Sequence, residues 1–96
     1  MTLEEFKQSL EGGTAPSGLG QPLEALWHDG TGDWEAAHRC VQDGGGAAAW
    51  VHAYLHRKEG DDWNARYWHR QAGSVYPDDM SLDDEWDHLV RQLVAQ

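Results

Sequence analysis

The stretch AAAWVHAYLHRKEGDDWNARYWHRQAG, from Ala47 to Gly73, predicts two helices joined by a tight turn. Gly60 ends the first helix and Gly73 ends the second, while Asp61 or Asp62 caps the start of the second. The stretch contains three of the six tryptophans, two of the three tyrosines and three of the six histidines. Because aromatic side chains bury large areas, we expect this hairpin to form the centre of the fold.

Apolar residues at helical spacing continue on both sides of this hairpin. Thr2 and Glu5 are spaced as a capping box at the start of the first helix. The last helix has the clearest amphipathic pattern, with acidic residues in its first turns. We expect helices at residues 2–11, 22–28, 34–42, 47–59, 62–72 and 82–95. No segment alternates apolar and polar residues, so the sequence predicts an all-α fold.

The chain length of 96 residues predicts a single domain, residues 1–96, with about six helices in consecutive antiparallel hairpins. We expect residues 1–20 to form a helix and a flexible Gly/Pro/Ser-rich connector. Two helical hairpins follow at 22–73, with Asp29–Gly32 as the turn of the first one. Residues 81–96 contain the C-terminal amphipathic helix.

The formal net charge is −10, from 17 acidic and 7 basic residues. This acidity argues against binding to nucleic acid or to anionic membrane surfaces, since both favour Lys and Arg. No apolar stretch approaches the length of a membrane span, and no secretory signal opens the chain. The single cysteine, Cys40, excludes an internal disulfide, so we expect a cytoplasmic protein with Cys40 as a buried structural thiol.

Both predicted hairpins place a Gly-Asp turn and then small residues at the start of the second helix: Gly32-Asp33-Trp34-Glu35-Ala36-Ala37 and Gly60-Asp61-Asp62-Trp63-Asn64-Ala65. The run Ala65-Arg66-Tyr67-Trp68-His69-Arg70-Gln71-Ala72 is similar to the end of a repeat in the Sel-like subgroup of tetratricopeptide-type hairpins, with His69 in the place of a Tyr. The first hairpin departs from that pattern, because Cys40 and Val41 occupy the aromatic positions.

This resemblance covers residues 22–73 and implies stacked hairpins that bind peptides or proteins. Two hairpins with flanking helices imply a minimal closed domain and not a long groove. Residues 50–61 also resemble small bacterial proteins of uncharacterised function, and this second resemblance gives no indication of an activity.

His52 and His56 are one helical turn apart, and Glu59 shares their helix face. Two histidines at this spacing are able to bind a divalent metal when another helix supplies a further ligand. Candidates for that ligand are His38, His69 and Asp62. The alternative interpretation is that the pair is hydrogen-bonded or packed, because there is no HExxH motif and no cysteine set.

The middle of the chain also holds most of its cations, among them Arg57, Arg66 and Arg70, close to the aromatic Trp63. Arg offers bidentate contacts to carboxylates, so these residues are candidates for an acidic-peptide or anion site that also includes His69. The alternative is that the cations pair with the acids of the same hairpin or of the last helix.

We therefore predict a non-enzymatic module that binds a protein or peptide through His52, His56, Glu59, Trp63, Arg57, Arg66, Arg70 and His69. A second hypothesis is a small metal-binding protein or metal-dependent enzyme that uses His52 and His56. A third is a structural homodimer with surplus aromatic residues at its interface. No residue is predicted to be catalytic and no cofactor is expected, since no phosphate-binding loop or nucleophile elbow is present.

Overall fold

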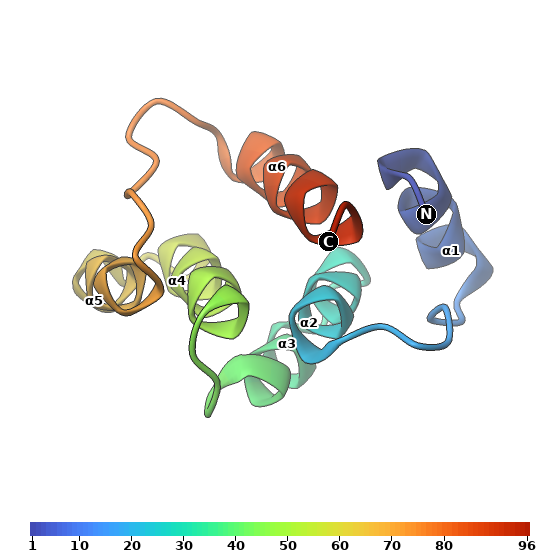
Figure 1. Cartoon of the computed structure of the whole chain (residues 1–96), viewed down its shortest axis with the longest axis horizontal. Helices are drawn as coiled ribbons and strands as arrows, with labels where there is room; N and C mark the ends of the chain where they lie inside the picture. Colours follow the sequence, from blue (N-terminus) through green and yellow to red (C-terminus); the bar gives the residue numbers. More distant parts are fainter.

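The computed structural model describes residues 1–96 and confirms the all-α prediction, with six helices and no strand. The helices are α1 (Leu3–Gly12), α2 (Gln21–Gly30), α3 (Trp34–Val41), α4 (Ala47–Lys58), α5 (Asp62–Ala72) and α6 (Leu82–Val94). They follow one another from α1 at one end of the long axis to α5 at the other, and α6 returns between them (Figure 1). None of these helices combines the length and apolar character needed to cross a membrane.

The α2–α3 and α4–α5 hairpins are joined by the same kind of turn. Gly32 and Gly60 adopt φ angles of 88° and 85°, in the left-handed region that glycine enters without strain. The next residues, Asp33 and Asp61, each accept a hydrogen bond from the backbone N–H three positions later. Each aspartate therefore caps the second helix of its hairpin, and of the two predicted caps for α5 the structure selects Asp61.

Helix α2 is longer than predicted, because Asp29 and Gly30 form its last turn and Gly32 is the residue that ends the helical path. Asp29 is buried, so its carboxylate needs partners. It accepts a hydrogen bond of 2.8 Å from the Tyr54 hydroxyl and pairs with the Lys58 ammonium at 2.9 Å. These contacts connect the end of α2 to α4.

The core lies where α6 packs against α1, α2 and α4. Phe6 of α1 is fully buried, and its ring centroid is 5.7 Å from that of Trp86 on α6. The predicted capping box forms at Thr2 and Glu5, so α1 begins as expected. Fifteen buried residues make up the core: Leu3, Phe6, Ala25, Leu26, Trp27, Ala37, Val41, Ala48, Val51, Tyr54, Leu55, Trp86, Leu89, Val90 and Leu93.

The expectation that the whole hairpin of residues 47–73 forms the centre of the fold holds for α4 and is wrong for α5. Helix α5 lies at the edge of the molecule, and α4 is the only helix against which it packs (Figure 1). Ala65 is fully buried at this contact, because its small side chain lets the two helices approach closely. The side of α5 that faces away from α4 is therefore covered by no other helix.

Candidate functional site

Three histidines from two helices meet beside the central hairpin. His52 and His56 stack on α4 with ring centroids 4.8 Å apart. His38 of α3 completes the group, because its Nε2 lies 3.0 Å from the Nε2 of His52. One ligand atom from each of these three rings lies within 4.8 Å of the others. We call His38, His52 and His56 the histidine cluster.

The cluster is largely shielded from water, with His52 3% and His56 8% exposed and His38 half-buried. Burial and the neighbouring His56 lower the pKa of His38. Burial, His56 and His38 lower the pKa of His52 to about 4. His38 and His52 are therefore neutral at pH 7, and a neutral imidazole has one nitrogen with a free lone pair.

The proton positions within the cluster follow from its hydrogen bonds. Only one proton can lie between the facing Nε2 atoms of His38 and His52, so one ring donates and the other accepts. The Nδ1 of His52 is buried and forms no hydrogen bond of standard geometry. The Val41 backbone is nevertheless close enough to favour a proton on the His52 ring.

Glu59 supports the third ring of the cluster. Its Oε2 lies 2.7 Å from Nδ1 of His56, and the Glu59 side chain is 39% exposed. A carboxylate accepts this hydrogen bond, so Nδ1 of His56 carries the proton, and Nε2 is the nitrogen that can offer a lone pair. The structure therefore brings together His52, His56 and Glu59, as the sequence predicted.

Two tryptophans hold the rings of the cluster from opposite sides. Trp34 on α3 stacks on His38 with centroids 5.0 Å apart and planes 9° apart. Its indole N–H donates to the Leu55 carbonyl at 2.9 Å, which fixes its position. Trp68 on α5 stacks on His52 at 4.1 Å with planes 18° apart. The imidazoles are thus oriented by packing before any ligand arrives.

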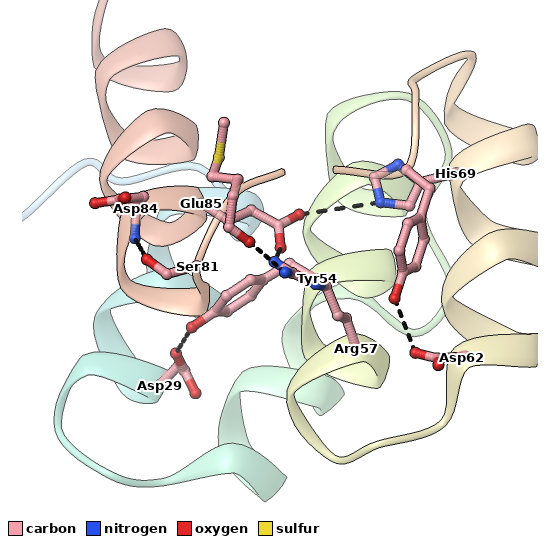
Figure 2. Close-up of polar contacts among 10 residues, drawn as sticks. Asp29, Tyr54, Arg57, Asp62, His69, Ser81, Asp84 and Glu85 are labelled. Atoms are coloured by element: carbon pink, nitrogen blue, oxygen red, sulfur yellow. Dashed lines mark hydrogen bonds and ion pairs between the residues drawn. The ribbon is translucent and has the colours of Figure 1, made fainter. Parts of the chain in front are cut away.

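His69 and Asp62, the other candidates for a third ligand, lie elsewhere. His69 is buried, and its Nδ1 is 2.7 Å from the Ser74 hydroxyl. Its Nε2 is 4.0 Å from Oε2 of Glu85 (Figure 2). These are the residue types of a nucleophilic triad. A separation of 4.0 Å is too long for a hydrogen bond, however, so Glu85 does not orient the imidazole as a triad requires.

Arg57 belongs to the interior and not to a binding surface. Its guanidinium donates to Glu85 at 2.7 Å and to the Met80 carbonyl, and the side chain is 16% exposed (Figure 2). Burial raises the pKa of Glu85, although Arg57 acts in the opposite direction. Of the three arginines proposed as contacts, Arg57 is therefore used to connect α4 to α6.

Three of the other proposed contacts, Trp63, Arg66 and Arg70, share the side of α5 that faces away from α4, whereas His69 of the same helix is buried. Trp63 is 71% exposed, and its ring is stacked on Tyr67 with centroids 6.1 Å apart. Arg66 and Arg70 are exposed on the same side, one helical turn apart. We call Trp63, Arg66, Tyr67 and Arg70 the α5 outer face.

The loop before α6 also contributes to this surface, which the sequence did not indicate. Tyr76 donates from its hydroxyl to Asp62 at 2.8 Å, and the Arg66 guanidinium lies 4.0 Å from the centre of its ring. A loop tyrosine has no periodicity that would place it, and the neighbouring Pro77 indicates only a turn.

Comparisons with protein families, curated proteins and solved structures found no match for the chain.

Proposed function

We propose that the protein is a non-enzymatic interaction module and that its α5 outer face binds an acidic segment of a partner protein. The single observation that carries this proposal is the 71% exposure of Trp63 on a helix that packs only against α4. Tryptophan is enriched among the residues that dominate binding energy at interfaces. A large aromatic ring left in water on an otherwise uncovered helix face favours a binding role.

The charge of the surface indicates the kind of partner. The chain has a net charge of −10, yet two arginines flank Trp63 on this face. Arg70 forms no ion pair, and the pair between Arg66 and the exposed Asp78 is long, at 3.7 Å. Stacking on Tyr76 leaves the N–H groups around the edge of the Arg66 guanidinium free to donate to carboxylates. An acidic partner with an apolar side chain for Trp63 matches this arrangement.

A homodimer through the same face is less well supported. A two-fold symmetric interface brings the same patch of both subunits together. Arg66 and Arg70 of one copy would then face those of the other, and like charges in contact are destabilising. A partner with carboxylates avoids this repulsion, so the face suits a different protein better than a second copy.

We also propose that the two hairpins are of the tetratricopeptide type and that the protein acts in the cytoplasm. The identical Gly-Asp turns and the fully buried Ala37 and Ala65 support the first part. The single cysteine supports a reducing compartment. The proposed contact surface is the outer side of one helix and not a concave groove between stacked hairpins.

The test is fluorescence anisotropy with a panel of labelled synthetic peptides in which Asp and Glu alternate with Leu and Phe, at low and at moderate salt. We expect at least one peptide to bind, with an affinity that falls as salt rises. The double variant Arg66→Gln/Arg70→Gln should weaken that binding about tenfold or more, since each exposed ion pair contributes roughly up to 1 kcal/mol. Trp63→Ala should weaken it further.

The matched control is Arg39→Gln/Arg91→Gln, which removes two exposed, unpaired cations at other places on the surface. Both double variants have the same net charge, so a difference between them reports the local surface. Equal loss in the two double variants, or unchanged binding in Trp63→Ala, would contradict the proposal.

A further inference from the structure

We propose that His38, His52 and His56 bind one divalent transition-metal ion of the zinc class, with Glu59 as the carboxylate that orients His56. This inference is independent of the proposed binding role of α5, because it concerns the opposite side of that helix. It extends the predicted His52–His56 pair with a ligand from α3, and it excludes His69 and Asp62 from the site.

The distances suit a tetrahedral ion with three nitrogen ligands. Zinc–nitrogen bonds of about 2.0–2.1 Å place the ligand atoms about 3.3 Å apart. The Nε2 atoms of His38 and His52 are 3.0 Å apart, and all three ligand atoms lie within 4.8 Å of one another. Binding of the ion therefore requires the three ligand nitrogens to adjust from separations of up to 4.8 Å to about 3.3 Å.

The proton balance is also favourable. When the metal binds, the proton between His38 and His52 moves from the Nε2 that carries it to the Nδ1 of the same ring. The metal takes its place between the two Nε2 atoms, and no proton is released from the protein. His52 then has its proton at Nδ1, and the nearby Val41 backbone raises the pKa of this ring. Both lone pairs at Nε2 become available for the ion, in the neutral form that metal sites require.

Glu59 supplies the hydrogen-bond acceptor for the ring nitrogen of His56 that does not bind the metal. Its Oε2 is 2.7 Å from Nδ1 of His56, so it fixes the tautomer that leaves Nε2 free. Metal-ligating histidines almost always donate their second N–H to a carboxylate, a carbonyl or water. Glu59 is also the C-terminal cap of α4, so its position is set by the same turn that begins α5.

Two other groups of potential ligands are weaker candidates. Glu24, His28 and Cys40 are close together, but burial and Glu24 raise the pKa of the Cys40 thiol, which disfavours the thiolate that binds metal. Asp61 lies near His56 and Glu59, but both of its carboxylate oxygens accept hydrogen bonds from Asn64. Neither group has a nitrogen pair as close as that of His38 and His52.

The surroundings largely enclose the site. Trp34 and Trp68 cover two sides of the rings, and three surface cavities of the molecule are lined by other residues. The fourth ligand is therefore water or a small anion and not an organic substrate. Because the ligands come from α3 and α4, the ion connects the first hairpin to the second.

The test is titration of the purified, tag-free and chelator-stripped protein with Co²⁺, monitored by the visible absorption of tetrahedral cobalt, followed by displacement with Zn²⁺. We expect one equivalent to bind, with intense ligand-field bands, and Zn²⁺ to displace it and raise the melting temperature. Glu59→Gln should weaken binding about 10- to 100-fold, as loss of an outer-shell partner does. His38→Gln should weaken it more strongly and remove the tetrahedral bands.

The matched controls are His28→Gln and His88→Gln, which each remove one histidine outside the cluster. Circular dichroism of the metal-free variants checks the fold. If His38→Gln does not fold, the partly exposed Glu59→Gln decides, since it leaves all three rings in place. The proposal is overturned if no equivalent of Co²⁺ binds, if its spectrum is octahedral, or if the control variants lose binding as much as the cluster variants do.

Discussion

The buried His52 makes the stability of the metal-free protein depend on pH, and the variant His52→Phe should remove this dependence. The pKa of His52 falls from an ordinary value of 6.5 to about 4 in the folded chain. The unfolded ring therefore takes up a proton between pH 6.5 and pH 4 while the folded ring does not, so stability falls as pH falls through this window. Phenylalanine keeps a flat ring against Trp68 but does not titrate.

The magnitude follows from the same two pKa values. Between pH 7 and pH 5, the difference in proton uptake by this one ring amounts to about 2 kcal/mol of unfolding free energy. The groups that face His52 are His38 from α3 and His56 from its own helix, while α5 contributes the uncharged Trp68. Both neighbouring histidines remain in the variant, although His38 loses the ring with which its Nε2 shares a hydrogen bond.

The assay is urea denaturation of wild type and His52→Phe at pH 7 and pH 5, with chelator present, followed by circular dichroism. The quantity of interest is the wild-type loss of stability from pH 7 to pH 5 minus the same loss in the variant. We expect it to be positive and about 2 kcal/mol. A value near zero, or a variant that loses more stability than wild type, would show that His52 titrates in the folded protein as it does in water.

Three further predictions concern stability measured by urea denaturation at pH 7. Glu85→Gln should lower the free energy of unfolding by about 3–5 kcal/mol, because it leaves Arg57 without its charged partner. Glu85→Leu/Arg57→Met should recover most of this loss, and a double variant as unstable as the single one would show that the pair has a different role. Trp63→Ala should change stability by less than about 0.5 kcal/mol, since its ring is 71% exposed, and a larger loss would indicate a packing role. Gly60→Ala should lower the free energy of unfolding by about 1–2 kcal/mol, because Gly60 has a φ of 85°. Gly45 has open space around it and no left-handed φ angle, so Gly45→Ala should not lower stability, and equal effects of the two variants would refute the backbone argument.

The helices could be predicted from the sequence because the signals that end them are local. Asp33 and Asp61 cap the helices that follow them, and Gly32 and Gly60 reverse the chain before them. The prediction placed the end of α2 too early, at the Asp-Gly pair before Gly32. Both Gly30 and Gly32 can end a helix. The choice between them depends on Asp29, because Tyr54 and Lys58 on α4 bind its carboxylate in the last turn of α2. That contact is tertiary and leaves no local pattern.

The candidate site was partly predictable for the same reason. The spacing of His52 and His56 placed them on one face of a helix, and that arrangement is found. Their convergence with His38 depends on how α3 packs against α4, so no sequence pattern could distinguish His38 from His69 as the third ring. Likewise, Arg57, Arg66 and Arg70 look alike in the sequence. Only the packing of α6 shows that Arg57 is paired with Glu85.

The two proposed sites use opposite sides of α5, and this division follows from helical periodicity. Trp68 turns inward and stacks on His52, while Trp63 and Tyr67 turn outward and stack on each other. The histidine cluster therefore needs a buried, uncharged wall, whereas the outer face needs cations and an exposed aromatic ring. The short helix α5 meets both demands because residues three or four positions apart share one side of a helix, so each turn places residues on both sides. Trp68 is the one residue of α5 that touches the cluster through its ring and also meets Tyr67, with centroids 5.1 Å apart. Trp68 therefore connects the histidine cluster to the aromatic rings of the α5 outer face.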